Sequence, residues 1–219
     1  QSFNVDYPIT TGFGNILYDH SGNQNHGTIV GATWEEVISG CADPYAENYD
    51  ENADVDDGSC YYPDNGEYVL SFNGSGDHVN FGTDPSTELS GDITLAAWIK
   101  FDNFNNNNAA VISKTSGEGS AVGYAFEKKN AQDKISFWIG DGNSFNEVYS
   151  PNLSPDTWYF IAATNDGSTS KLYIDGEFIA SGSSGHPAGP TGDLKIGIHS
   201  SLSTGGRYWD GSIDNVSIW

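Results

Sequence analysis

The most acidic stretch of the chain carries side chains whose type and spacing could bind a metal ion. Asp50, Asn52 and Asp54 alternate as in the first half of an EF-hand calcium loop, but valine stands where that loop needs glycine. A second partial match, formed by Asp54, Asp56 and Asp57 before Gly58, lacks the glutamate that completes the loop. The segment is therefore not an EF-hand. It is either a non-standard calcium loop or a solvated acidic lid, and both interpretations stay open. The candidate ligands are Asp54, Asp56 and Asp57.

The whole chain is strongly acidic. Eight Lys and Arg residues stand against 30 Asp and Glu residues, which gives a formal net charge of −22. Such a charge repels phosphates and anionic lipids, so we expect no nucleic-acid partner and no membrane insertion. Hard, oxygen-preferring cations such as Ca²⁺ are the natural counter-ions. The alternative is that the charge serves solubility alone.

Two cysteines, Cys41 and Cys60, enclose this acidic stretch. Two thiols without a Cys-x-x-Cys motif or nearby histidines lack the ligands for zinc, so we predict a disulfide formed in an oxidising compartment. The segment 39–63 has few strand formers and is too short for a core of its own. We interpret it as a disulfide-closed insertion. We expect a secreted or cell-surface fragment that adjoins other domains of a larger extracellular chain.

The rest of the chain has the pattern of short strands separated by turns. Runs of β-branched and aromatic residues alternate with Gly, Asn, Asp and Ser, and no stretch sustains a 3.6-residue period, so helix should be scarce. Asp-Gly pairs, at 141–142 and 175–176 among others, predict hairpin turns. The predicted strands are 93–101, 109–113, 123–127, 134–139, 157–165, 170–175, 194–199 and 213–219.

These strands predict an all-β fold, a two-sheet antiparallel β-sandwich. A length of 219 residues suits one such domain, so residues 1–219 are expected to form a single sandwich with the insertion at about 39–63. Trp98, Trp158 and Phe160 lie among alternating apolar residues. We expect these three aromatic side chains to fill the core between the sheets.

Six short stretches, in the order of the chain, resemble motifs of the laminin-G-like, concanavalin A-like lectin/glucanase superfamily. They are the D-x-S-G-x-x-N-H-G element at 19–27, LSFNG at 70–74, TLAAWIK at 94–100, TWYFIA at 157–162, LYIDG at 172–176 and DGSIDNVSI at 210–218. The resemblance covers about 16–37 and 66–219 and implies a jelly-roll fold. The family's first strand is blurred at 4–9. The insertion resembles a C-x-D-P-x-A-x-N-Y…D-D-G-S-C motif in repeats of secreted proteins from marine bacteria.

The resemblance also implies a calcium site. In the family, the loop with the first motif lies close to an aspartate of the last motif, and the two clamp one Ca²⁺ ion. By position, Asp19 and Asp214 would supply carboxylates, and Asn23 and Asn25 would add oxygen ligands. The alternative is that Asp19 caps a turn and Asp214 accepts hydrogen bonds from backbone amides.

Aromatic and polar residues near turns suggest a carbohydrate ligand, because sugars present both apolar C–H faces and hydroxyl groups. For each aromatic the alternative is packing at the rim of the sandwich. Arg207, the sole arginine, could pair with a sugar carboxylate or sulfate, or it could neutralise an aspartate. The amide-rich loop 103–108 is a further candidate. The predicted ligand-binding residues are Trp138, Asp141, Asn143, Tyr149, Arg207, Tyr208 and Trp209.

Catalytic motifs are missing from the sequence. The glucanase branch of the superfamily carries an E-x-D-x-x-E run on one strand, and neither this run nor G-x-S-x-G or H-E-x-x-H occurs here. We therefore expect a non-enzymatic, calcium-binding, lectin-like adhesion module, monomeric, with a glycan or polysaccharide ligand. The alternative is a structural or protein-binding spacer of an adhesin with calcium for stability only. A glycoside hydrolase is a third hypothesis.

Overall fold

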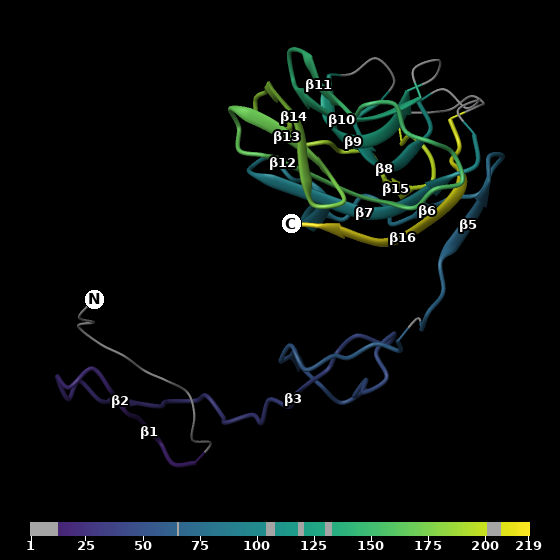
Figure 1. Cartoon of the computed structure of the whole chain (residues 1–219). Helices are drawn as coiled ribbons and strands as arrows, with labels where there is room; N and C mark the ends of the chain where they lie inside the picture. The colour runs from purple at the N-terminus through teal and green to yellow at the C-terminus, as the bar shows by residue number, and fades with distance from the viewer. Residues whose placement is uncertain (1–12, 65, 104–107, 118–120, 130–132, 201–206) are drawn as a thin grey trace. The chain divides into compact units, whose positions relative to one another are not determined.

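The computed structural model describes residues 13–64, 66–103, 108–117, 121–129, 133–200 and 207–219. The chain divides into two compact units, Gln1–Gly66 and Glu67–Trp219, and both large sheets belong to the second unit (Figure 1). The organisation of residues 1–219 as one domain stays a prediction. Among the described residues, no helix has the length and apolar character to cross a membrane.

The second unit is a sandwich of two antiparallel sheets with six strands each. One sheet has the order β14-β13-β12-β7-β16-β5 and the other the order β11-β10-β9-β8-β15-β6. The first is built from β5 (Leu70–Asn73), β7 (Ile93–Phe101), β12 (Tyr159–Asn165), β13 (Thr169–Ile174), β14 (Glu177–Ser183) and β16 (Asp210–Ile218). The second is built from β6 (Val79–Asn80), β8 (Ala110–Thr115), β9 (Val122–Lys129), β10 (Lys134–Asp141), β11 (Phe145–Tyr149) and β15 (Leu194–Ile196).

The predicted fold class is confirmed. The bounds of β7 are those predicted, whereas β16 begins three residues earlier than expected, and β11 was not predicted. In the described part of the chain, the only helix is a 3₁₀ turn, η1 (Pro85–Thr87), as the missing helical periodicity indicated. The Asp175-Gly176 hairpin is also confirmed, because φ is positive at both residues (51° and 83°) where β13 turns into β14.

Strand alternation builds the core between the two sheets. In β7 every second residue is buried, and the same period places apolar side chains of β9 and β10 against them. Burial of this continuous apolar surface is the main force that holds the sheets together. The fully buried side chains of these three strands include Leu95, Ile99, Phe101, Tyr124, Phe126, Ile135, Phe137 and Ile139.

The prediction that Trp98, Trp158 and Phe160 fill the core is wrong. Trp98 is 39% exposed and Trp158 is 37% exposed, and the ring of Trp98 lies 5.4 Å from that of Phe160. Ala97 and Ile99, the neighbours of Trp98 in β7, both point into the core. The two-residue period of a strand therefore turns Trp98 to the outer face of the sheet.

The first unit contains short strands and the disulfide loop. β1 (Ile16–Leu17) pairs with β2 (Gly27–Thr28), and β3 (Ser39–Gly40) pairs in parallel with β4 (Val55–Asp56). The predicted disulfide between Cys41 and Cys60 is confirmed, with an S–S bond of 2.03 Å. The amide of Asp50 donates to the carbonyl of Cys41, which fastens the loop from within. The family's blurred first strand, 4–9, lies outside the described residues.

Candidate ligand-binding face

The outer face of the β10 sheet carries a compact group of aromatic and charged side chains. Ile135, Phe137 and Ile139 of β10 point into the core, so Trp138 points to the outer face. The Trp138 ring stacks on the imidazole of His199, with centroids 6.0 Å apart and planes 14° from parallel. We call the following set the β10 cluster: Glu127, Lys129, Trp138, Glu147, Tyr149 and His199.

Strand register brings the charged members of the β10 cluster together. Ser136 of β10 lies opposite Glu127 of β9 and opposite Tyr149 of β11, while Trp138 lies opposite Glu147. The ammonium group of Lys129 donates to a carboxylate oxygen of Glu127 and lies 2.5 Å from Glu147 Oε1. The hydroxyl of Tyr149 donates to the other Glu147 oxygen. One lysine thus joins carboxylates from two strands.

Burial sets the protonation of this cluster. Burial raises the pKa of Glu127, and the nearby ammonium of Lys129 opposes the rise. Burial, followed by the positive charges of Arg207 and Lys129, lowers the pKa of His199 to about 4. His199 is therefore neutral at pH 7, so its Nε2 atom, 3.6 Å from Glu127 Oε2, forms no ion pair with that carboxylate.

Among the described residues, the aromatic side chains of β11 are the most exposed part of this face. Tyr149 is 39% exposed, and the adjacent Phe145, which meets Trp138 edge-on at 5.6 Å, is 53% exposed. Trp138 itself is only 4% exposed. A ligand that approaches this face therefore meets the two rings of β11 first, with Lys129 and Glu147 beside them and Trp138 beneath.

Comparison with known protein families identifies the fold. A laminin G-type profile described as the concanavalin A-like lectin/glucanases superfamily matches residues 73–219. This chain belongs to the concanavalin A-like lectin/glucanase superfamily. Two uncharacterized proteins from two strains of Mycobacterium tuberculosis are 31% identical to it over 100 residues. The match takes 43% of this chain and spans 16% of each relative's length.

Solved structures share the fold of this superfamily member at low sequence identity. Domains LG4-5 of the mouse laminin alpha1 chain match with a TM-score of 0.54 and 14% identity, over 68% of this chain and 40% of that one. The CBM40 of Ruminococcus gnavus IT-sialidase, bound to α2,3-sialyllactose, matches with a TM-score of 0.53 and 15% identity, over 69% of this chain and 88% of that one. A putative carbohydrate-binding protein of Bacteroides ovatus matches with a TM-score of 0.52 and 22% identity, over 69% of this chain and 42% of that one.

The structure brings three of the predicted ligand-binding residues of this superfamily member together. Trp138 and Tyr149 belong to the β10 cluster, and the Arg207 carbonyl accepts a hydrogen bond from the amide of His199. Asp141 lies at the β10–β11 turn, where its carboxylate accepts hydrogen bonds from the amides of Asn143 and Ser144. These amides lower the pKa of Asp141. Asp141 and Asn143 thus shape the turn that starts β11.

Trp209 and Tyr208 have other surroundings. Trp209 is fully buried and meets Phe101 edge-on at 6.3 Å, so we replace its predicted ligand contact with a role in the core. The ammonium of Lys128 lies 5.6 Å from the centre of the Trp209 ring. Tyr208 is half-buried with its ring 6.4 Å from that of His78. Residues 104–107 of the amide-rich loop lie outside the described residues.

The aspartates of the predicted calcium sites accept hydrogen bonds from their own chain. Asp19, in the first unit, accepts from the amides of Ser21 and Asn25. Asp214, in the second, accepts from the amide of Asn215. These are the local roles of the non-metal alternative. Asn23 lies in the same turn, and its amide donates to the Ser21 hydroxyl.

The acidic loop behaves in the same way. Asp54 accepts from the amide of Ile38, Asp56 from Gly58 and Asp57 from Ser59. Within the part of the chain that the structure describes, no group of three or more His, Cys, Asp or Glu side chains gathers as a metal site. These carboxylates already accept hydrogen bonds from their own chain. The calcium site of Asp19 with Asp214 and that of the acidic loop therefore both stay predictions from the sequence.

Four members of the β10 cluster were not predicted as ligand-binding: Glu127, Lys129, Glu147 and His199. The i, i+2 spacing of Glu127 with Lys129, and of Glu147 with Tyr149, is a weak signal that each pair shares one side of a strand. The sequence alone does not pair β9 and β11 with β10. Without that register, the two carboxylates and the lysine have no shared position.

Proposed function

We propose that the chain is a lectin-like binding module and that the β10 cluster is its glycan-binding site. The observation that carries the proposal is the half-exposed ring of Tyr149 beside Glu147 and Lys129. An aromatic ring packs against the apolar C–H face of a sugar, and adjacent charged groups exchange hydrogen bonds with its hydroxyls. Membership of the superfamily and the carbohydrate-binding structural neighbours support this assignment.

The β10 cluster is preorganised for such a ligand. Lys129 holds Glu147, and Glu147 in turn accepts the hydroxyl proton of Tyr149, so the polar groups beside the ring are fixed before a sugar arrives. Trp138 packs beside β11, edge-on to Phe145, and its ring stacks on that of His199. Groups that are fixed in advance lose little conformational entropy on binding, which favours affinity for small polar ligands.

Hydrolysis of the glycan is the competing function, because Glu127 and Glu147 both approach Lys129. A retaining glycosidase needs one carboxyl free to protonate the leaving oxygen and one free to attack the sugar. Here the ammonium group of Lys129 stands between the two carboxylates and engages both. We therefore propose binding rather than catalysis. Sugar release from a polysaccharide panel that Glu127→Gln abolishes would reverse this assignment.

A glycan array tests the proposed function, followed by calorimetry on the best ligand. Tyr149→Ala removes the exposed ring and is expected to weaken binding by at least tenfold, whereas Tyr149→Phe keeps the stacking surface and loses less. Tyr68→Ala is the matched control, because Tyr68 is 83% exposed and lies outside the cluster. Equal affinity of the Tyr149→Ala and Tyr68→Ala variants would contradict the site.

The proposed setting is extracellular, within a longer adhesive or secreted chain. The Cys41–Cys60 disulfide supports an oxidising compartment. The net charge of −22 supports a monomer that avoids nucleic acid and anionic membranes. The spacer alternative predicts a folded chain that binds none of the glycans on an array, so the same array separates the two hypotheses.

A further inference from the structure

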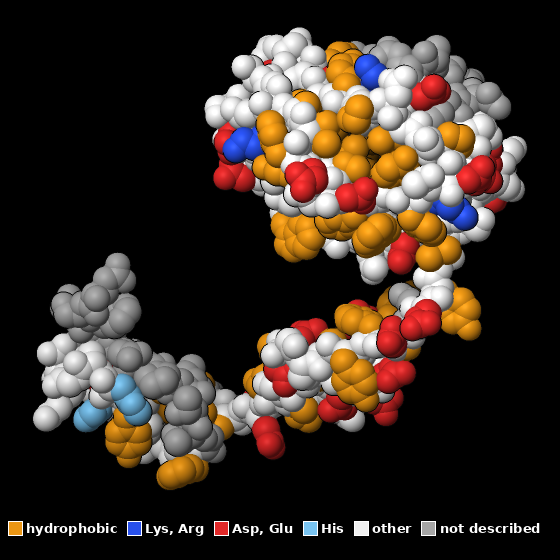
Figure 2. Space-filling model, in the orientation of Figure 1, with side chains coloured by type: hydrophobic (Ala, Val, Ile, Leu, Met, Phe, Trp, Pro, Cys, Tyr) orange, Lys and Arg blue, Asp and Glu red, His pale blue; other side chains and the backbone are white. Residues whose placement is uncertain are grey.

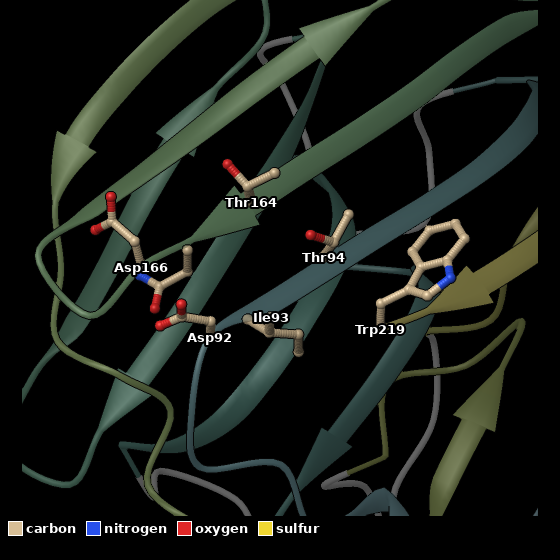
Figure 3. A pocket seen from close by; sticks show the side chains of 7 residues that line it. Asp92, Ile93, Thr94, Thr164, Asp166 and Trp219 are labelled. Atoms are coloured by element: carbon tan, nitrogen blue, oxygen red, sulfur yellow. The ribbon is translucent and has the colours of Figure 1, made fainter.

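The opposite sheet has a pocket of about 340 Å³ that lies outside the β10 cluster. It sits where β7 begins and where β12 and β16 end, and Figure 3 shows its side chains from close by. The polar and aromatic groups that line it are Asp92, Thr94, Thr164, Asn165, Asp166 and Trp219. None of these residues was predicted to bind a ligand.

Backbone pairing places three of these side chains in one row. Thr94 and Trp219 exchange both backbone hydrogen bonds, at 2.9 and 3.0 Å, so they lie directly opposite each other. Thr164 of β12 lies opposite Thr94 on the other side of β7. Because Ile93 and Leu95 point into the core, Thr94 and its two partners project outward, as Figure 3 shows. Trp219 is 66% exposed.

Two carboxylates stand at the other side of the pocket. Asp166 accepts hydrogen bonds from the hydroxyl and amide of Ser168 and from the amide of Thr169, which lower its pKa to about 2 and fix its orientation. Asp92 is well exposed, with its Oδ1 atom 3.7 Å from Nδ1 of His186. The pocket therefore offers carboxylate oxygens, which accept hydrogen bonds from hydroxyl groups.

A shallow floor continues from the pocket along the same outer face. Ala96 and Ala162 lie opposite each other one step further along β7 and β12, and their small side chains leave the surface low. At the far end stands the exposed Trp98, packed against Phe160. Figure 2 shows hydrophobic side chains gathered on this side of the second unit, over β7 and β16. Trp98 is four residues from Thr94, or about 13 Å along the strand.

We infer that this surface is a second glycan-binding site, specific for a neutral oligosaccharide chain that spans from Trp219 to Trp98. The two indoles stack on separate sugar rings, the threonines exchange hydrogen bonds with hydroxyls beside Trp219, and Asp92 and Asp166 accept hydrogen bonds from the sugar beyond that end. Three carboxylates, those of Asp92, Asp166 and Asp214 (opposite Trp98), outnumber the ammonium of Lys171 (opposite Thr164), so the surface disfavours sugars that carry carboxylate or sulfate groups. The same carboxylates also repel a second copy of this chain, which carries the same acidic rim and a net charge of −22.

The test is a titration of the full chain with cellohexaose, laminarihexaose and mannohexaose, followed by the indole NMR signals and by calorimetry. At least one of these neutral hexamers is expected to shift two indole signals, which Trp98→Phe and Trp219→Phe assign. Trp98→Ala and Trp219→Ala are each expected to weaken binding about tenfold, as the loss of one stacked ring predicts. Both side chains are on the surface, so thermal melts are expected to show that both variants fold.

A hexagalacturonate, the acidic comparison, is expected to bind at least tenfold more weakly than the neutral hexamer. Tyr68→Ala, at an exposed tyrosine outside both surfaces, should leave the affinity for the neutral hexamer unchanged. A hexamer held at the β10 cluster would instead lose affinity in Tyr149→Ala and keep it in Trp98→Ala. The inference is overturned if no neutral hexamer shifts an indole signal, if Trp98→Ala and Tyr68→Ala bind the hexamer equally well, or if hexagalacturonate binds as tightly as the hexamer. Sedimentation that shows a dimer lost in Trp219→Ala would assign the surface to self-association instead.

Discussion

The ring of Trp138 lies parallel to the imidazole of His199, 6.0 Å away, on the outer face of the β10 sheet. This stack buries a histidine beside Lys129 and Arg207, whose positive charges add to the effect of burial and hold the pKa of His199 near 4. The neutral ring is therefore part of the folded state at pH 7, and protonation acts against folding.

Acidification is expected to destabilise the protein through His199. The folded pKa of about 4 lies below the reference value of 6.5, so between these values the unfolded chain binds a proton that the folded chain does not. Stability then falls as the pH falls from 6.5 to 4, by about 3 kcal/mol in all for this group. The raised pKa of Glu127 works in the opposite direction and offsets part of the loss.

Urea unfolding at several pH values measures this effect. The His199→Asn variant is expected to lose the acid-dependent slope, whereas His186→Asn, at a partly exposed histidine, should keep it. Parallel stability curves for the native protein and His199→Asn would show that His199 does not titrate as described.

Removal of Lys129 is expected to leave two carboxylates on the β10 sheet without their shared counter-charge. Glu127 is nearly fully buried, so Lys129→Met should lower the free energy of unfolding by about 3 kcal/mol. Chemical denaturation measures the change. The double variant Glu127→Gln/Lys129→Met should recover part of it, and Lys171→Met, at a half-buried lysine of the other sheet, should cost under about 1 kcal/mol. Equal losses for the two lysine variants would argue against the ion cluster.

Gly211 is expected to tolerate no side chain. Its φ is +130°, and a Cβ atom there would lie 2.2 Å from the backbone carbonyl oxygen of Lys100 in β7. Gly211→Ala should therefore destabilise the sheet by about 3 kcal/mol. Gly176→Ala is the matched control, because φ is also positive but no atom lies within 4 Å, so only about 1 kcal/mol of backbone strain is expected. Melting temperatures that fall equally would contradict the steric cause.

Reduction of the Cys41–Cys60 disulfide is expected to loosen the acidic loop. The bond closes a short loop with two hydrogen bonds near its ends. The amide of Asp50 donates to the Cys41 carbonyl, and the amide of Glu47 donates to the carbonyl of Tyr61, next to Cys60. Without the cross-link the unfolded loop has more conformational entropy. The folded loop is therefore expected to lose about 3 kcal/mol of stability relative to the unfolded one. Hydrogen exchange with and without a thiol reductant should show faster exchange of these amides, with β10 as internal reference. Unchanged protection would mean that the hydrogen bonds alone hold the loop.

Calcium is expected to stabilise the chain if Asp19 and Asp214 bind it. Thermal melts in calcium and in EDTA measure the gain, and Asp19→Asn and Asp214→Asn should each reduce it, since calcium needs carboxylate oxygens. Asp193→Asn removes a carboxylate that accepts a hydrogen bond from Asn80, and should leave the gain intact. A melting temperature that is the same in calcium and in EDTA would contradict the predicted site of Asp19 and Asp214, and that of the acidic loop as well.

The alternation of apolar residues in β7 was enough to predict the strand and its bounds. The same alternation also marks Trp98 as an outward residue, yet its size suggested the core. Ala96 and Trp98 make that face of β7 partly apolar as well, so the sequence left open whether the face is covered. Trp98 therefore became a surface residue only through the burial of Ala97 and Ile99 against the second sheet.

The sequence by itself determined the sandwich class, the Asp175-Gly176 hairpin and the disulfide, because strand period, turn chemistry and cysteine pairing are local properties. Only the tertiary structure decided which side chains share a surface. Glu127, Lys129 and Glu147 meet because β9 and β11 flank β10 in one register, and Trp219 and Thr164 lie on either side of Thr94 in β7. Such pairings depend on long-range hydrogen bonds between strands, which leave little trace in the residues of any one strand.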